Sequence, residues 1–543
     1  MFRRIAVRVL VLLAVCAPWF NIVRDNADSA GMLAHLHGMF VDVDLLYDDE
    51  YRALGVTPTF AFVTGQGVVS NHWPAGATWL QAPGYGLGLL AARVLEATGL
   101  RLNPYGAVPL LAVRTLAMVV LAFVLRAIGR AYAHVGGTRA AWLAVTAWAV
   151  GTPLLFYASE APLRPHLWGF AVMTGLVLAW RDTRWGSPLS RAVVLGTTVG
   201  LAASIRPQLA AIWLLVAEDV WRDAAPGRVR RLGVAALAAA VWPLLHLRMQ
   251  LWMYGPGLGD YAGQTTHHLR AFLFSPYHGA LTWSPILGVG LLALAWAVVG
   301  RRRAAWLLAA LFVHQIWLDC GMRDIAEFSV LGTRTWSGGT SFGARKLLDA
   351  LPLLLPATLE LVAALRERPG AALSLAAAVL ATCVPSVLLY CAAFVDPGTT
   401  GALLDWRGLG VVLERPLSLE AWGAAAAARE VPWKVWGTIV MVVTLPCALA
   451  SVRLERALER ARPVARTGLV AALLVGGGVA AQLWLSVAMV RSDLALAEDP
   501  QRMAVARAAM HPAHRAAVSR IPARHATLRA LLGEHAAPAT TAR

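Results

Sequence analysis

Charged residues are scarce in this sequence. Only 15% of its 543 residues are Asp, Glu, Lys or Arg, whereas an ordinary soluble domain carries about 25%. Hydrophobic residues make up 58% of the chain, and the mean hydropathy is +0.59. The composition therefore excludes an ordinary soluble protein and predicts a chain that is embedded in a lipid bilayer.

Cysteine is also rare. The cysteines are odd in number, lie mostly within apolar runs and lack the spacing of metal ligands, so the sequence predicts neither a disulfide framework nor a zinc site. We expect the protein to act without a metal or a cofactor. The five residues are Cys16, Cys320, Cys383, Cys391 and Cys447.

Lysine is almost absent, since only Lys346 and Lys434 are lysines. The 48 basic residues nevertheless outnumber the 31 acidic ones and give a net charge of +17. The basic residues form short clusters between apolar runs, as in the cytoplasmic loops of polytopic membrane proteins. The positive charge therefore indicates membrane topology, and we expect no binding to nucleic acid.

Apolar runs long enough to cross a bilayer recur along the whole chain. The first run could be a signal peptide or an anchor. We interpret it as an anchor because Pro18 and Trp19 directly follow Cys16-Ala17, a poor context for cleavage. With the arginine clusters placed inside, the sequence predicts an all-α polytopic protein with about thirteen transmembrane helices, its N-terminus inside and its C-terminus outside. The expected spans are 1–23, 104–125, 140–158, 166–180, a hairpin broken at Arg206-Pro207, 232–252, 281–300, 304–319, 346–365, 371–395, 432–452 and 467–490.

The apolar segment 76–96 is rich in glycine. We interpret it as a re-entrant or surface-lying helix, because a full span there would place the later arginine clusters outside. The tail 491–543 is rich in Ala and Arg with helical spacing, which predicts an amphipathic region on the outer side. Large outer loops, which we expect to be helical in part, are then 24–75, 253–280, 320–345 and 396–431.

The first outer loop is strongly acidic. A solvated acidic surface explains most of its carboxylates, but Asp28 differs because it follows the first span within a few residues. A carboxylate held near the membrane boundary can deprotonate a hydroxyl or amine acceptor. The spacing alone leaves both interpretations of Asp28 open. The carboxylates of this loop are Asp25, Asp28, Asp42, Asp44, Asp48, Asp49 and Glu50.

Three segments carry a resemblance to a known family. They resemble, in order, the outer loops of the GT-C superfamily of polyprenyl-phosphate-sugar-dependent glycosyltransferases, which contains protein O-mannosyltransferases and the aminoarabinose transferase of lipid A. The likeness is greatest to a bacterial branch with an Asp-Ser start, and it covers roughly residues 1–365. The segments are Val41-Asp42-Val43-Asp44-Leu45 leading to Asn71-His72-Trp73-Pro74-Ala75-Gly76, Leu273-Phe274-Ser275-Pro276-Tyr277-His278-Gly279 leading to Trp283-Ser284-Pro285, and Trp336-Ser337-Gly338-Gly339-Thr340-Ser341-Phe342-Gly343-Ala344-Arg345.

The resemblance implies a GT-C fold and a catalytic base in the first outer loop. By its order in the chain, Asp28 matches that base. Ser29 stands where the superfamily frequently has a second acid, so Asp42 and Asp44 are candidates to assist. The reaction would be a metal-independent displacement at the anomeric carbon of the donor sugar.

The resemblance also implies the partners and the organisation of the chain. The donor would be a polyprenyl-phosphate sugar in the outer leaflet of the inner (plasma) membrane, because nucleotide sugars are confined to the cytoplasm. The acceptor would be a lipid, a glycan or a protein, and membrane lipids would surround the protein. Residues 1–365 would form the catalytic module, 366–490 the C-terminal transmembrane helices, and 491–543 the outer tail.

Cations beside or within apolar spans are candidates to bind the donor. Arg114 lies inside an apolar span, where an ionisable group is costly and usually faces a cavity. Arg206 stands at the helix break, where a guanidinium can bind phosphate oxygens. Arg345 and Lys346 follow a Gly-rich segment at an outer helix start, which is a plausible phosphate cradle.

Four polar residues of outer turns are candidates to line the site. His72 could face the substrate, or its segment could simply start the helix that follows. Glu160 and His166 could line the site or cap an outer turn. His278 could bind substrate or be a histidine satisfied within its loop.

Two other classes of function remain open. A transporter or lipid flippase would place polar groups near the membrane midplane on broken helices, often in two related halves. Here the acids gather in outer loops, and neither halves nor a repeat of fixed period is evident. A non-catalytic scaffold gives no reason for ordered acidic and Gly-rich outer loops. The sequence therefore favours a glycosyltransferase, with the transporter as the alternative.

Overall fold

The computed structural model describes the greater part of the chain. Within the described ranges the chain forms helices and turns and no β-strand, which confirms the prediction of an all-α protein. These ranges are 27–54, 64, 66, 68–71, 73–99, 107–182, 187–223, 225–255, 267–321, 342–396, 405–414 and 463–498.

Among the described residues, six helices are long and apolar enough to cross a membrane, and two shorter apolar helices accompany them. The chain is therefore a polytopic membrane protein, as predicted. The expected total of about thirteen spans stays a prediction, because the runs 1–23 and 432–452 lie outside the described residues. The six helices cover Val108–Val150, Pro188–Ile205, Arg228–Tyr254, Arg345–Leu365, Pro369–Ala393 and Gly468–Leu496.

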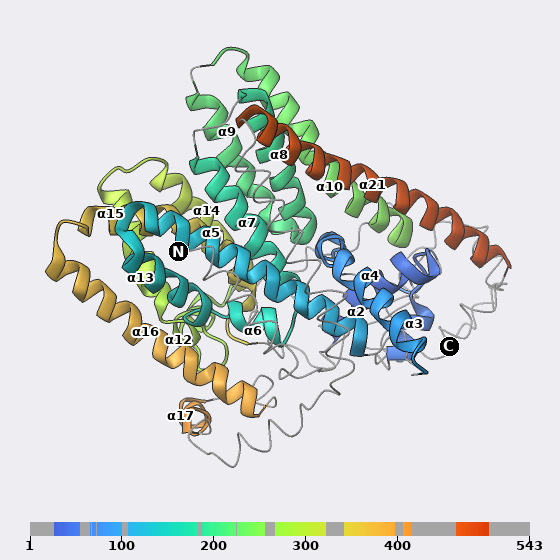
Figure 1. The fold of residues 1–543 in the computed structure, drawn as a ribbon, viewed down its shortest axis with the longest axis horizontal. Coiled ribbons are helices and arrows are strands. Elements are labelled where there is room, and N and C mark those ends of the chain that lie inside the picture. Colours follow the sequence, from blue (N-terminus) through green and yellow to red (C-terminus); the bar gives the residue numbers. More distant parts are fainter. Residues whose placement is uncertain are drawn as a thin grey trace, which may run out of the picture.

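The segment predicted to be the first outer loop folds, where it is described, into short helices that precede a longer one. α2 (Ala27–His37), the π-helix η2 (Gly38–Asp42) and α3 (Asp48–Leu54) lead to α4 (Gly76–Glu96), and Figure 1 shows these blue elements together at one side of the molecule. α4 packs along the start of the next long helix. Since α4 is not among the six helices that meet the length and hydropathy of a span, its re-entrant or surface position stays a prediction.

The next helix, α5 (Ala107–Val150), is broken at Gly137, whose backbone has φ 78° and ψ −173°. A positive φ of this kind strains any residue with a Cβ, so glycine suits the position. The break falls between the two spans predicted for this region. α6 (Leu154–Ser159) and α7 (Pro165–Arg181) follow, and α7 carries proline in its first turn.

The predicted break at Arg206-Pro207 is present. α8 (Pro188–Ile205) ends there, Arg206 has extended backbone angles, and the chain continues as the 3-10 helix η3 (Pro207–Ile212) and α9 (Trp213–Arg222). Proline at the first position of η3 prevents α8 from continuing, because it has no N–H to donate. The break leaves Arg206 at the end of a helix.

α10 (Arg228–Tyr254) lies alongside α8 in close contact. A Cβ added at Gly200 would lie 2.0 Å from the carbonyl oxygen of Ala239, and one at Gly196 would lie 2.2 Å from that of Ala235. The two glycines therefore allow the backbones of α8 and α10 to approach each other.

The second half of the chain completes the bundle. In Figure 1 the red helix α21 runs beside α8 and α10, and it also reaches the first outer loop, where Leu45 N donates to Ser492 Oγ at 2.7 Å. α21 continues past residue 490, where the sequence placed the start of the tail. The helices are α11 (Leu269–Phe274), α12 (Ala280–Trp283), α13 (Ile286–Val299), α14 (Ala305–Gly321), η6 (Arg345–Leu354), α15 (Leu355–Leu365), α16 (Pro369–Val395), α17 (Trp406–Glu414) and α21 (Pro463–Glu498).

The 3-10 helix η6 positions the site. All of its residues are buried, because it packs against both α7 and α14. Gly169 of α7 makes room for it, since a Cβ there would lie 2.8 Å from the carboxyl group of Asp349. η6 therefore brings Arg345, Lys346 and Asp349 against the start of α7.

Candidate functional site

Asp28 lies in the first turn of α2 and is held from two sides. Its Oδ1 accepts a hydrogen bond of 2.9 Å from the indole Nε1 of Trp73, and its Oδ2 forms an ion pair with Arg345 at the start of η6. Trp73 can lie directly against α2 because Gly31 has no side chain; a Cβ there would lie 2.1 Å from the indole. The carboxylate is thus fixed between the first outer loop and η6.

Opposing effects act on the pKa of Asp28. Burial raises this pKa. The charges of Arg345 and Arg164 and the hydrogen bonds from Trp73 and Arg345 together lower it by more, so the pKa of Asp28 lies well below the ordinary value. Asp28 is therefore ionised at neutral pH. A carboxylate so stabilised is a weak base while Arg345 remains beside it.

Arg206 joins two buried carboxylates on different elements. Its Nη1 lies 2.6 Å from Asp349 Oδ2, and its Nη2 lies 3.3 Å from Asp319 Oδ1. The same Nη1 donates to the backbone carbonyl of Lys346, and Gln315 Nε2 donates to Asp319 Oδ1 at 3.0 Å. Arg206 therefore ties α14 and η6 to the end of α8.

His166 connects this group to Asp28. Its Nδ1 lies 3.8 Å from Asp349 Oδ2, and it lies within electrostatic reach of Asp28, Arg164 and Arg345. Cations and carboxylates thus alternate through one buried region at the ends of several helices. We call this region the polar cluster: Asp28, Arg164, His166, Arg206, Asp319, Arg345, Lys346 and Asp349.

The polar cluster contains five of the residues that the sequence singled out. They come from parts of the chain that lie far apart, and their roles stay predictions. The guanidinium of Arg206 already has two carboxylate partners, so a donor phosphate would have to share it. The five residues are Asp28, His166, Arg206, Arg345 and Lys346.

Asp42 and Asp44 make their contacts beyond the other end of α2. Asp42 Oδ2 lies 3.4 Å from Nε2 of His37, the last residue of α2, and Asp44 accepts from the backbone N–H of Leu46 at 3.1 Å. At 1.5 Å per residue, His37 lies about 14 Å along the helix from Asp28. Assistance of Asp28 by either carboxylate therefore stays a prediction that these contacts do not favour.

Arg114 and Glu160 lie around a different residue. Both are within electrostatic reach of Tyr390 on α16, whose hydroxyl lies 3.0 Å from Ser159 Oγ. Phe342 packs against the Tyr390 ring with 6.2 Å between centroids, just before the segment that carries Arg345. Tyr390, Phe342 and Trp283 pack against one another in turn, and we call these rings the aromatic layer. The two candidates thus lie near the aromatic layer and not within the polar cluster.

His278 lies against the aromatic layer. It is buried, with φ 62°, stacks on Tyr277 at 4.0 Å and meets Trp283 edge-on at 5.1 Å. Ring packing thus holds His278 in its loop, and a role in binding substrate stays a prediction. His72 lies outside the described residues, while its neighbour Asn71 donates to the Gly31 carbonyl at 2.9 Å.

The sequence assigned no individual role to four residues of the site. Asp319 and Asp349 are acids within the apolar runs 304–319 and 346–365, and the rule that drew attention to Arg114 applies equally to them. Arg164 gives no such signal, because a charged residue is ordinary in a turn, and Trp73 was noted only as part of the motif Asn71-His72-Trp73-Pro74-Ala75-Gly76.

The described residues include no group of three or more His, Cys, Asp or Glu side chains that could hold a metal ion. Parts of the predicted outer loops, including 322–341, lie outside the described residues. Action without a metal therefore stays a prediction.

No protein-family model matches the chain, and comparison with curated proteins finds no match. Among solved structures, the chain is similar to the crystal structure of ArnT from Cupriavidus metallidurans bound to undecaprenyl phosphate. The identity is 13% and the TM-score 0.43, and the match covers 93% of this chain and 77% of that one. A likeness of this extent does not establish a family or a function.

Proposed function

We propose that the protein is a glycosyltransferase of GT-C type that transfers a sugar from a polyprenyl-phosphate donor to an acceptor at the outer face of the membrane. The observation that carries the proposal is the ion pair of Asp28 with Arg345, which sets a candidate base directly beside a candidate phosphate ligand. The ordered motifs of the outer loops support it independently.

The phosphate of the donor would compete with Asp28 for Arg345. Arg345 and Lys346 are adjacent at the start of η6 and both are buried, so an entering anion would find two cations there. Once Arg345 turns to the phosphate, burial is the largest remaining influence on the pKa of Asp28, and it raises that pKa. Donor binding would therefore turn a weak base into a competent one.

The transfer itself follows from this arrangement. The acceptor oxygen or nitrogen bonds to the anomeric carbon while the bond from that carbon to the phosphate oxygen breaks. Asp28 takes the proton of the acceptor, and polyprenyl phosphate leaves with its additional negative charge stabilised by Arg345 and Lys346. Arg206 would act as a positioning residue, because its bonds to Asp349 and to the Lys346 carbonyl hold η6 in place.

One observation favours the alternative of a transporter. Arg206 stands at a helix break, and its partners Asp319 and Asp349 lie in apolar helices. Buried ionisable residues on broken helices are typical of transport pathways. The two functions therefore need an experiment that separates cleavage of the donor from its movement.

Proteoliposomes that contain the purified full-length protein would be given a panel of polyprenyl-phosphate sugars and extracts of envelope acceptors. A glycosyltransferase releases one polyprenyl phosphate for each sugar transferred. This release does not depend on whether the donor also moves between leaflets. Movement of an intact donor between leaflets, without release of polyprenyl phosphate from any member of the panel, would reject the proposal and establish the alternative.

A further inference from the structure

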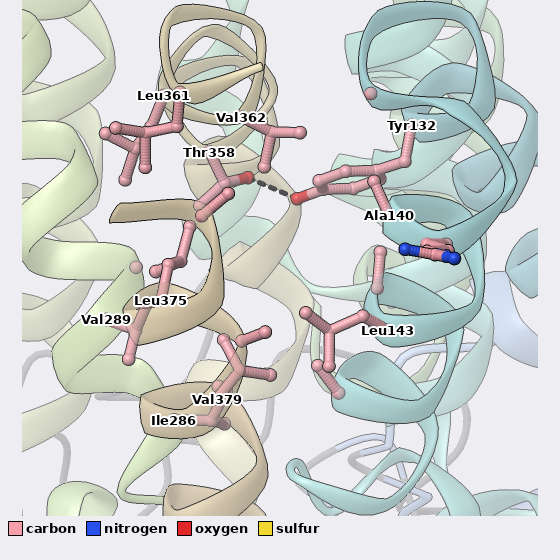
Figure 2. Close-up of a pocket in the computed structure, with 18 of the residues that line it drawn as sticks. Tyr132, Ala140, Leu143, Ile286, Val289, Thr358, Leu361, Val362, Leu375 and Val379 are labelled. Atoms are coloured by element: carbon pink, nitrogen blue, oxygen red, sulfur yellow. Dashed lines mark hydrogen bonds between the residues drawn. The ribbon is translucent and has the colours of Figure 1, made fainter. Parts of the chain in front are cut away.

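A cavity of about 620 Å³ lies between α5, α13, α15 and α16, away from the polar cluster. Figure 2 shows Leu143 of α5 on one side and Val379 of α16 on the other, with Ile286 of α13 just below Val379 at the lower end. Its volume is that of a pocket for a small ligand. Its wall is largely apolar, so it suits a hydrocarbon chain.

The other end of the cavity is polar. Tyr132 of α5 donates to Thr358 Oγ1 of α15 at 2.6 Å, and Figure 2 shows this bond across the gap between the two helices. The helices touch beside it, since a Cβ at Gly136 would lie 2.6 Å from Val362 Cγ1. The cavity is therefore closed at this end by the contact between α5 and α15.

Two arginines line the cavity at the same end. Arg139 follows the break of α5, and Arg366 ends α15, so both stand where their helices turn. Both are exposed, and no carboxylate of the described residues forms an ion pair with either one. The arginine distribution predicts that this end faces the cytoplasm.

The outer wall of the cavity is a helix that borders the lipid. Leu373 and Val384 of α16 are 72% and 55% exposed, and an apolar helix face of this kind in a membrane protein faces acyl chains. A lipid can therefore reach the cavity beside α16 without crossing the bundle.

We propose that the cavity binds one anionic phospholipid of the cytoplasmic leaflet. An acyl chain lies between α5 and α16, and the phosphate lies between Arg139 and Arg366. Basic pockets between transmembrane helices on the cytoplasmic side bind anionic head groups in this way, because the guanidinium charges and the apolar wall act together. This inference does not depend on the proposed function.

Native mass spectrometry of the full-length protein, with phosphatidylglycerol or phosphatidylcholine added, tests the proposal. We expect one phosphatidylglycerol to be retained and phosphatidylcholine to be retained far less. Arg139→Gln combined with Arg366→Gln should weaken retention by about tenfold or more, since each basic residue near the surface contributes about 1 kcal/mol. The matched control is Arg228→Gln with Arg230→Gln, an exposed pair on α10 outside the cavity lining, which should retain the lipid normally.

A second variant tests the acyl-chain part without touching the charges. Ala376→Leu narrows the cavity from α16 and should reduce retention while leaving both arginines in place. Equal retention of both lipids, or unchanged retention in the double arginine variant, would overturn the proposal. Absence of any retained lipid would also overturn it.

Discussion

At the scale of single residues, the contact between Asp28 and Arg345 determines what each can do. Arg345 holds the Asp28 carboxylate ionised, and Asp28 keeps the guanidinium near the start of η6. Removing either partner leaves a buried charge without its counterion, which is costly. The pair is therefore sensitive to any anion that competes for Arg345.

Arg345→Lys should weaken use of the donor by about tenfold, because lysine lacks the planar fork that engages a phosphate through two parallel bonds. The dependence of polyprenyl phosphate release on donor concentration measures this effect. Arg301→Lys, at an exposed turn outside the polar cluster, is the control. A normal apparent affinity for the donor in folded Arg345→Lys would remove Arg345 from the phosphate site.

Glu50 of α3 predicts a pH dependence of stability. Burial, followed by the neighbouring Asp49 carboxylate, raises the pKa of Glu50 to about 11. The unfolded chain ionises this group at pH ~4.3, the ordinary pKa of a glutamate side chain. Between these two pH values Glu50 is protonated in the folded protein and ionised in the unfolded chain. As pH rises through this range, the free energy of unfolding therefore falls by about 1.4 kcal/mol per pH unit.

Glu50→Gln removes this proton difference and should make the protein more stable than the wild type at pH 8. Thermal unfolding in lipid nanodiscs from pH 5 to pH 9 measures it, with the half-exposed Glu96→Gln as a control that leaves the wild-type slope in place. If Glu50→Gln loses stability with pH in parallel with the wild type, Glu50 is ionised in the folded protein.

The sequence contained enough to find Asp28 and Arg345 but not their contact. Order along the chain and neighbouring motifs pointed to each residue separately. Their pairing depends on η6 lying across α7, which follows from packing at Gly169 and from no local pattern. Asp349 completes this packing, but in the sequence it stands out only as an acid within an apolar run.

At the scale of elements, glycines determine how closely α8 and α10 pack. Gly200→Ala would force a methyl group to within 2.0 Å of the Ala239 carbonyl, so the helices must separate. We expect a loss of about 1–3 kcal/mol in the free energy of unfolding, as in other overpacked cores. Denaturation of the lipid-embedded protein followed by tryptophan fluorescence measures it.

Gly233→Ala in α10 is the matched control, because nothing lies within 4 Å of its added Cβ. Alanine there should stabilise slightly through its higher helix propensity. Similar effects of the two substitutions would mean that helix propensity, and not the approach of α8 to α10, accounts for the change.

Hydropathy predicted the positions of several helices, and a proline predicted one helix break. The apolar runs matched α10, α14 and α16, and the Arg206-Pro207 break is present. The sequence did not indicate the continuity of α5 up to Gly137 or the 3-10 form of η6. Both depend on neighbouring helices, since a 3-10 segment of this length is uncommon by itself.

At the scale of the whole molecule, the segment that follows α2 and the end of α21 lie on one side. Leu45 donates to Ser492, and Trp484 Nε1 donates to the Met39 carbonyl at 3.1 Å. The arginine pattern predicts that this side faces outward and that the turn at Arg302 faces the cytoplasm. The topology is therefore open to a direct test.

In a cysteine-free background, Val41→Cys and Leu494→Cys should both react with an impermeant thiol reagent in intact cells, and Arg302→Cys should react only after the membrane is opened. Val41 and Leu494 are 44% and 57% exposed, so burial does not prevent labelling. Labelling of Arg302→Cys in intact cells, with the other two protected, would invert the topology and place the polar cluster near the cytoplasm.

The most direct test of the proposed function compares wild-type protein with Asp28→Asn in the same proteoliposomes. Asparagine keeps the shape and the Trp73 hydrogen bond but cannot take the proton of the acceptor, so release of polyprenyl phosphate should fall by about a hundredfold or more. Donor binding should persist, because Arg345 loses its competitor. The control Asp493→Asn, at an exposed site where the amide oxygen can still accept from Trp252, should leave the rate unchanged.

A hundredfold loss of transfer in folded Asp28→Asn, with donor binding intact, is the result that the account predicts. Nearly normal transfer by Asp28→Asn, measured with the same donor and acceptor, would contradict it and exclude Asp28 as the base.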